Sequence, residues 1–388
     1  MKKFIIVTVG ISVIAGCAQV TRYLSGTSYF YRQLHADSWT ESGGNAAVID
    51  STIERIKTLN STANHNVDLV TKEYKPGNWQ YQWDEAAQKA ISQKDYFAAA
   101  TYYTIAAYPF MNDDNLSNRS YGLALSNYKL GVENDGNYIE ELKINTPKGI
   151  AYSYLHLPEK APNKRLPLLI VTNGSDQSLT TLYPVYRDYL KPRGWAMITL
   201  DLPGIGSNVH IGINTNETNL IHQNLLHHLK QEPRIDQQKI ALMASSFGGN
   251  AATKTAFTNP DDIVAVVNIC GAVNAPFLKL KFALTQVPQM TGDAFLQRFD
   301  ASKEEIIKTS DKLALSTDYL GKTKTSVPIL SIGHDSDGIA PLSDMRLTTA
   351  SSIGGKHIVV DKGTDEGHCP SDEIALDIAT KWLDTILQ

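Results

Sequence analysis

A serine in a short run of small residues is the strongest chemical signal in the sequence. The run Ala244-Ser245-Ser246-Phe247-Gly248 follows an apolar stretch and leads into a helix-like segment without a linker. This is the small-x-Ser-x-small pattern of a nucleophile elbow, in which the central hydroxyl projects from a sharp strand-to-helix turn. We expect Ser246 to be a catalytic nucleophile, although serine and glycine also make ordinary turns.

Side chains that can complete a catalytic triad follow two later apolar runs. Asp335 and Asp337 come after the run 328–332, and His368 lies in the last loop. Serine, acid and histidine therefore occur in the chain order of α/β-hydrolases. We favour Asp337 as the acid because a short apolar stretch ending in proline follows it, whereas Asp335 can brace its own turn.

Two backbone amides are expected to bind the oxyanion. The polar turn at 172–176 follows an apolar run, at a place where α/β-hydrolases put one donor. We assign this role to the N–H of Ser175 and to that of Phe247, although a simple loop explains the turn equally well. The sequence has no metal-ligand cluster, dinucleotide fingerprint or P-loop, so neither a metal nor a cofactor is expected.

These residues lie at the ends of apolar runs that alternate with helical segments. Such alternation predicts a mostly parallel sheet with helices on both faces, with chemistry at the carboxyl ends of its strands. The expected elements are strands at 140–145, 150–157, 166–171, 196–200, 240–243, 263–269, 328–332 and 357–360, and a final helix at 371–387. The Asp-x-Pro-Gly-x-Gly turn at 201–206 is expected to be architectural. This pattern predicts the α/β-hydrolase fold.

The first third of the chain has helical periodicity and few strand signals, which predicts a helical N-terminal domain over 17–137. One helix is expected to begin after Asp95, and another to run from about 116 to 130 and end at Gly131.

The hydrolase domain is expected over 138–388, with a helical insertion at about 272–326. We place the substrate pocket between this insertion and the helical domain. Large apolar side chains of the insertion that could cap it include Phe277, Leu278, Phe282, Met290, Phe295 and Phe299.

The N-terminus predicts export and lipid anchoring. Two lysines, an apolar run at 4–14 and the sequence Ala15-Gly16-Cys17 are typical of a lipoprotein signal peptide over 1–16, with Cys17 acylated. A plain signal peptide with a chance cysteine is the alternative. Because Ala18 rather than aspartate follows, we expect a protein anchored in the cell envelope, at the outer membrane of a Gram-negative bacterium.

Composition and cysteine usage add little. The 388 residues are 42% hydrophobic and 20% charged with a net charge of −4, which does not favour a nucleic-acid partner. Besides Cys17 the chain has Cys270 and Cys369. These two could pair in an exported protein. Nothing in the sequence places them together, and we expect buried free thiols.

Five strings rich in aromatic, proline and glycine residues are specific enough to indicate a family. They are Tyr74-Lys-Pro-Gly-Asn-Trp79, Tyr102-Tyr-Thr-Ile-Ala-Ala-Tyr-Pro109, Tyr186-Arg-Asp-Tyr-Leu190, Phe247-Gly-Gly-Asn-Ala251 and Ala375-Leu-Asp-Ile-Ala-Thr-Lys-Trp382. In these strings the chain resembles the fermentation–respiration switch protein (FrsA-like) family of bacterial α/β-hydrolases, over about 74–386. The resemblance implies a helical domain over a hydrolase domain, and hydrolysis of carboxylic esters.

The chain departs from well-known members of that family in two respects. Those members lack a serine at the elbow centre and a histidine in the last loop, whereas Ser246 and His368 are present here. They are also cytosolic, whereas this chain has an export signal. The regulatory, partner-binding role of the family therefore does not transfer, while hydrolysis becomes more credible.

The sequence thus predicts a serine hydrolase that cleaves small-molecule carboxylic esters through an acyl-enzyme intermediate. One alternative is a non-catalytic binding or regulatory protein on a hydrolase fold, since a fold does not define a function. Another is an acyltransferase or amidase that uses the same serine. The sequence fixes neither the acyl chain length nor the oligomeric state.

Overall fold

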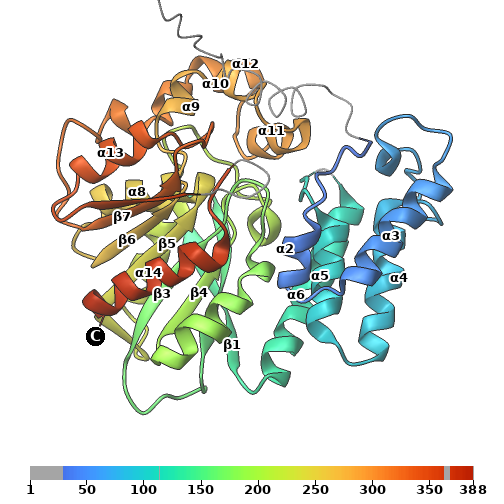
Figure 1. The fold of residues 1–388 in the computed structure, drawn as a ribbon. Coiled ribbons are helices and arrows are strands. Elements are labelled where there is room, and N and C mark those ends of the chain that lie inside the picture. The colour runs from blue at the N-terminus through green and yellow to red at the C-terminus, as the bar shows by residue number, and fades with distance from the viewer. Residues whose placement is uncertain (1–28, 113, 362–367, 388) are drawn as a thin grey trace, which may run out of the picture.

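The computed structural model describes residues 29–112, 114–361 and 368–387, which are organised around one sheet of eight strands (Figure 1). The strands are β1 (Tyr138–Thr146), β2 (Gly149–Leu157), β3 (Leu166–Thr172), β4 (Ala196–Leu200), β5 (Ile235–Ser245), β6 (Ala265–Ile269), β7 (Ile329–His334) and β8 (Lys356–Val360). Their order is β1-β2-β4-β3-β5-β6-β7-β8, and only the β1–β2 and β2–β4 pairs are antiparallel. This mostly parallel sheet confirms the predicted α/β-hydrolase fold class.

Helices cover both faces of the sheet. On one face α14 (Asp372–Leu387) shares a hydrophobic core with β3, β5, β6 and β7, and Figure 1 shows it lying across the strands. On the other face α7 (Leu220–Leu229) and α8 (Ser246–Thr258) pack on the same strands. The central strands β4 and β6 are buried at every position, as expected for parallel strands covered on both sides. By contrast β8, at the edge, is exposed from residue 356 to 359.

Within the described residues, five α-helices precede the sheet: α2 (Ala36–Glu41), α3 (Ala46–Leu59), α4 (Trp79–Ser92), α5 (Tyr96–Ala107) and α6 (Asn115–Asn134). The four longer ones each begin after an Asn or Asp whose side chain accepts a backbone N–H of the first turn. Asp95 has this role for α5, as the sequence predicts. Helix α5 is buried from Ala98 to Ala107 on all sides rather than along one face, because it lies between α4 and α6 and against the hydrolase half.

The predicted helix end at Gly131 is wrong, because α6 continues to Asn134. Gly131 instead makes room for an aromatic ring. A Cβ added there would lie 2.9 Å from ring atoms of Phe97. The glycine with left-handed backbone that follows the helix is Gly136, with φ of +72°.

The helical half and the hydrolase half share buried contacts. Tyr121 Oη donates to Asp201 Oδ2 over 2.6 Å. Tyr128 Oη lies 2.8 Å from His156 Nε2 in β2. One hydrophobic core continues across the boundary: it joins Trp79, Trp83 and Tyr102 of the front helices to Phe247, Phe277 and Phe295 of the hydrolase half.

The insertion between β6 and β7 consists of short helices beyond the carboxyl end of the sheet (Figure 1). These are α9 (Ala275–Leu278), α10 (Leu280–Ala283), α11 (Gln289–Leu296) and α12 (Lys303–Lys308), and α13 (Leu342–Ala350) follows β7. Of the six apolar residues expected to cap the site, Phe277, Met290, Phe295 and Phe299 are buried. The other two, Leu278 and Phe282, are 53% and 63% exposed.

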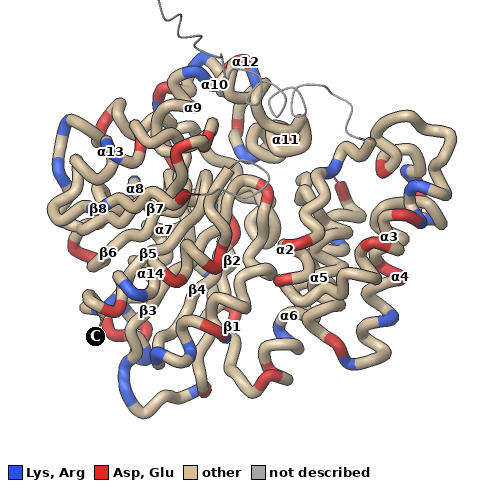
Figure 2. Tube along the Cα trace, in the orientation of Figure 1, with Lys and Arg blue, Asp and Glu red and all other residues tan. Residues whose placement is uncertain are grey.

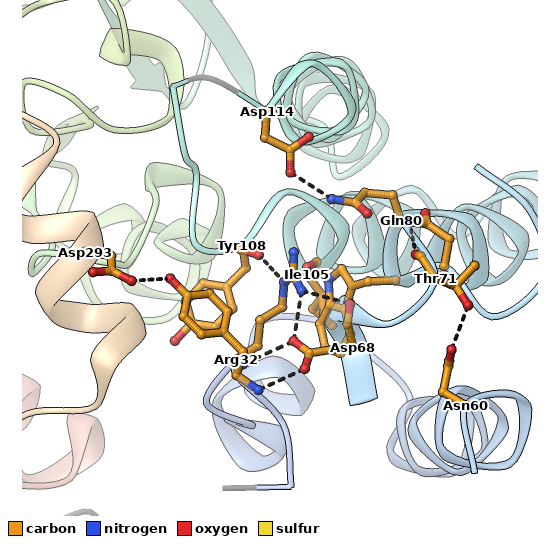
Figure 3. Close-up of polar contacts among 12 residues, drawn as sticks. Arg32, Asn60, Asp68, Thr71, Gln80, Ile105, Tyr108, Asp114 and Asp293 are labelled. Atoms are coloured by element: carbon orange, nitrogen blue, oxygen red, sulfur yellow. Dashed lines mark hydrogen bonds and ion pairs between the residues drawn. The ribbon is translucent and has the colours of Figure 1, made fainter. Parts of the chain in front are cut away.

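A segment before α2 connects the front helices to the insertion. Tyr31 Oη donates to Asp293 in α11 over 2.8 Å. The neighbouring Arg32 forms a buried ion pair of 2.8 Å with Asp68 and donates to the carbonyl oxygen of Tyr108 (Figure 3). The insertion is therefore held from two sides, by the sheet and by the front helices.

Two observations bear on possible large partners. Basic and acidic residues are interspersed along the described chain rather than gathered in one basic stripe (Figure 2). In the part of the chain that the structure describes, no helix is both long and apolar enough to cross a membrane. The signal segment 1–16 and Cys17 lie outside the described residues.

Candidate active site

The elbow forms where β5 passes directly into α8. Ser246 is the first residue of the helix and has φ of +49°, in the left-handed region that non-glycine residues rarely adopt. Such a conformation costs on the order of 1–3 kcal/mol and persists only where the surroundings impose it. Close packing imposes it here, because a Cβ added at Gly248 would lie 2.4 Å from the carbonyl oxygen of Asn173. Ser245, by contrast, is still paired with Ile269 of β6 as a strand residue.

The three side chains of the predicted triad lie within hydrogen-bonding distance of one another. His368 Nε2 is 2.9 Å from Ser246 Oγ. On the other side of the ring, His368 Nδ1 is 2.9 Å from Asp337 Oδ2 and 3.0 Å from Oδ1. Asp337 follows β7 and its side chain is fully buried, whereas that of His368 is 25% exposed. Asp335, the alternative acid, is exposed to solvent.

The buried carboxylate of Asp337 is well satisfied. Its Oδ1 accepts the N–H groups of Ile339 and Ala340, each over 2.8 Å. Burial alone would raise its pKa, but the hydrogen bond and charge of His368, together with these two amides, outweigh burial and leave the pKa below its ordinary value. The carboxylate is therefore ionised at neutral pH and can hold the imidazole in one orientation.

The two expected oxyanion donors border the nucleophile. A Cβ added at Gly174 would lie 3.0 Å from Ser246 Cβ and 3.4 Å from its Oγ, so the 172–176 turn passes beside the serine. Ser175 is the next residue of this turn. Phe247 is in the first turn of α8, where backbone N–H groups have no partner within the helix.

A buried arginine contacts both of these residues, and the sequence reasoning missed it. Arg298 Nη2 donates to the carbonyl oxygen of Ser175 over 2.7 Å, and its guanidinium carbon lies 4.8 Å from the ring centroid of Phe247. Burial lowers the pKa of Arg298 to about 9, against the raising effect of the Asp176 charge. It remains cationic at neutral pH. An arginine in a helical insertion looks like a surface residue in sequence, so no pattern indicates its role.

The turn at 201–206 is architectural. Asp201 is buried and accepts the N–H of Leu179 over 2.7 Å and that of Ser207 over 2.9 Å. Burial raises its pKa, and these hydrogen bonds oppose the shift. A Cβ at Gly204 would lie 2.3 Å from Cβ of Arg298. Because this glycine has no side chain, the turn can pack directly against the arginine.

Cys270 and Cys369 form a disulfide across 99 residues of sequence, so the expectation of free thiols is wrong. Cys270 directly follows β6, and the chain brings Cys369 beside it after β8, a proximity that sequence separation conceals. With His368 they form the one group of metal-ligating side chains seen among the described residues, their ligand atoms within 4.8 Å of one another. The two sulfurs are bonded to each other.

Comparison with known proteins places the chain among esterases by sequence. A family model described as esterase FrsA-like matches residues 14–388. Esterase FrsA of Vibrio cholerae serotype O1 is 29% identical over 380 residues, covering 94% of this chain and 90% of that protein. Esterase FrsA of Photobacterium profundum is 29% identical over 365 residues, covering 88% and 86%.

Solved structures support the fold. AbyA5 superposes with a TM-score of 0.65 at 21% identity, covering 87% of this chain and 99% of that one. The 2,6-dihydroxy-pseudo-oxynicotine hydrolase superposes with a TM-score of 0.66 at 16% identity, covering 90% and 95%. The fold and the esterase relatives together support an esterase or other hydrolase. By the match over nearly its whole length, the chain belongs to the esterase FrsA-like family.

Proposed function

We propose that this protein is a serine hydrolase that cleaves carboxylic esters through an acyl-enzyme intermediate. The observation that carries the proposal is the pair of 2.9 Å contacts on either side of the His368 ring, one to Ser246 Oγ and one to Asp337. A nucleophile, a base and an orienting carboxylate in this arrangement are the working parts of acyl transfer to serine.

Acylation follows from these positions. His368 Nε2 takes the proton of Ser246 as its Oγ attacks the ester carbonyl carbon, and the negative charge moves to the carbonyl oxygen. The N–H groups of Ser175 and Phe247 stabilise that oxyanion. The imidazolium then gives its proton to the leaving alcohol oxygen as the carbon–oxygen bond breaks. Asp337 stays ionised and stabilises the charged ring.

Deacylation repeats the same steps with water. His368 takes a proton from a water molecule, whose oxygen attacks the acyl carbon of the ester on Ser246. The second tetrahedral intermediate collapses, Ser246 Oγ leaves with the proton from His368, and the carboxylic acid departs. An acyltransferase would differ only in replacing this water with another acceptor.

Labelling with a fluorophosphonate probe tests the proposal against a non-catalytic binding protein. The probe reacts only with an activated serine, so we expect the wild type to be labelled and Ser246→Ala to be unlabelled. An unlabelled, folded wild-type protein would favour the binding protein. Peptide mapping of the labelled protein must place the adduct on Ser246 rather than Ser245.

A substrate panel then separates the remaining possibilities. p-Nitrophenyl esters of increasing acyl length, matched anilides, and one ester assayed with added alcohol acceptors distinguish esterase, amidase and acyltransferase. We expect hydrolysis of the esters to exceed that of the anilides. Predominant transfer to an alcohol at low acceptor concentration would contradict the hydrolase assignment.

We further propose that Cys17 is acylated and anchors the protein in the outer membrane. Support comes only from the sequence around Cys17, since one lipid-modified residue is the only attachment it offers. We expect Cys17→Ser to leave the membrane fraction. If that variant still sediments with membranes after a high-salt wash, another attachment surface exists.

A further inference from the structure

The disulfide lies beside the proposed catalytic base in both sequence and space. Cys369 directly follows His368, and its N–H donates to Asp337 Oδ2 over 3.3 Å. Cys270 follows the central strand β6, and its N–H donates to the carbonyl oxygen of Ile332 in β7 over 2.7 Å. The disulfide therefore joins the segment that carries the histidine to a segment that directly follows an interior strand of the sheet.

The residues that directly follow Cys270 contact the nucleophile and its helix. The N–H of Ala272 donates to the carbonyl oxygen of Ser246 over 3.0 Å. A Cβ added at Gly249 in α8 would lie 2.6 Å from Cα of Gly271, so the backbone after Cys270 packs directly on the elbow helix. The disulfide thus attaches the histidine segment to the stretch of chain that supports the serine.

We propose that the Cys270–Cys369 disulfide positions His368 for proton transfer and that turnover depends on its oxidised state. This inference rests on the proposed serine-hydrolase function. Misplacement of a catalytic group by about 1 Å can lower turnover by about 10²-fold. Because Cys369 is the next residue after His368, breaking the disulfide removes a restraint on the backbone that carries the imidazole. We expect reduction to lower kcat by about 10- to 100-fold and to leave KM within about twofold.

The redox step needs a dithiol reductant as co-reactant. One thiolate of the dithiol attacks a sulfur of the bridge, which forms a mixed disulfide and releases the first cysteine; the second thiol of the reductant then closes a ring and releases the second cysteine. The reductant gives up two electrons and two protons, which appear in the two cysteine thiols. Reoxidation reverses the exchange, so the loss of activity is expected to be reversible.

The test measures ester hydrolysis by the full chain before reduction, after dithiothreitol treatment and after reoxidation. Active sites are counted by phosphonylation of a separate sample of the same enzyme. EDTA must be present, because the freed thiols and the imidazole have ligand atoms within 4.8 Å of one another and can bind zinc. Thermal melting checks that the reduced enzyme is folded at the assay temperature. We expect kcat to fall and then recover while KM stays nearly constant.

The double variant Cys270→Ala/Cys369→Ala is the matched control. We expect its kcat to equal that of the reduced wild type and to be unaffected by dithiothreitol. A disulfide that only stabilises the fold would lower the melting temperature and leave kcat of the folded enzyme unchanged, which overturns the inference. Alkylation and mass spectrometry showing two free thiols in the native protein would also overturn it. A wild type that is neither labelled nor active defeats the proposed function and this inference with it.

Discussion

The two halves of the active site are built differently. Ser246 stands at the end of β5, a central strand with neighbours on both sides, and begins a helix that is buried almost throughout. His368 follows β8, the edge strand, whose residues are mostly exposed. The nucleophile is therefore held by the backbone packing of the sheet centre, whereas the base is held by its contacts with Asp337 and by the disulfide at Cys369.

This difference predicts which substitutions should lower turnover and which should lower the stability of the fold. On the nucleophile side the backbone is so crowded that added atoms disturb the fold. On the base side single polar or covalent bonds determine orientation, so their loss should lower turnover in a protein that stays folded. The following predictions test that division, from the largest effect to the smallest.

Removing the nucleophile should have the largest effect. In Ser246→Ala no oxygen remains to attack the ester, and losses on the order of 10⁶-fold in kcat are known for such changes in serine proteases. Ser245→Ala should change kcat by less than about tenfold, because Ser245 is a strand residue paired with Ile269, whereas Ser246 is the serine whose Oγ lies 2.9 Å from His368 Nε2. Turnover of both variants on one p-nitrophenyl ester decides it, and a larger loss at Ser245 would mean that the elbow is misassigned.

Asp337→Asn should lower kcat by about 10⁴-fold, which is the cost of the wrong imidazole tautomer when the triad aspartate of a serine protease is replaced by asparagine. The amide is similar in size, so the melting temperature should change far less than activity. Asp335→Asn is the matched control, because this aspartate is exposed, and its loss should cost at most about tenfold in kcat. The opposite ranking of the two variants in a turnover assay would show that the acid is Asp335.

Gly248→Ala should destabilise the protein by about 3 kcal/mol or more, because its Cβ would lie 2.4 Å from a backbone oxygen. On the base side, Gly338 adjoins Asp337 and has no atom within 4 Å of an added Cβ. Gly338→Ala should therefore change the free energy of unfolding by less than about 1 kcal/mol. Denaturant unfolding of both variants measures the contrast, and equal effects would contradict the difference in crowding.

The smallest expected effect is the pH dependence of stability from a buried histidine on the nucleophile side. His222 in α7 lies 3.0 Å from Thr172 at the end of β3, and burial lowers its pKa from 6.5 to about 4. The unfolded chain therefore takes up a proton first as the pH falls. This histidine's contribution is unchanged above pH 6.5 and opposes folding progressively between pH 6.5 and about 4.

The matched variant His222→Gln removes this proton. We expect its free energy of unfolding to fall less steeply with acid than that of the wild type, by up to about 1.4 kcal/mol per pH unit. Other buried groups such as His156 titrate in the same range, but they are present in both proteins. The difference between the two slopes therefore isolates the contribution of His222. Parallel slopes for the two proteins in urea unfolding between pH 7 and pH 5 would contradict the prediction.

The sequence was most informative where function and secondary structure leave a local pattern. Apolar runs located six of the eight strands, a pair of strand-like segments around Pro147-Lys-Gly149 located the other two, and the small residues around Ser246 identified the turn where the backbone must close. His368 and Asp337 could be placed near Ser246 because parallel strands bring their carboxyl ends to one edge. These are short-range or topological signals.

Contacts that depend on three-dimensional proximity could not be predicted in the same way. The partners Cys270 and Cys369 are separated by 99 residues, and neither has a local pattern that names the other. Arg298 is fully buried against Ser175 and Phe247. Charged residues are rarely buried, and no local sequence pattern marks this one as an exception. The sequence predicts a helix end at Gly131, because the role of this glycine in packing against Phe97 depends on a neighbouring helix.

The hydrophobic core that joins the front helices to the insertion has a consequence for how this architecture can be modified. Trp83 and Phe277, which are far apart in the sequence, belong to the same buried cluster, and Tyr31 donates a hydrogen bond to Asp293 across the boundary. Cutting the chain before β1 would expose apolar surface on both fragments. The front helices are thus not a transferable module, because grafting them onto another hydrolase requires moving the insertion with them.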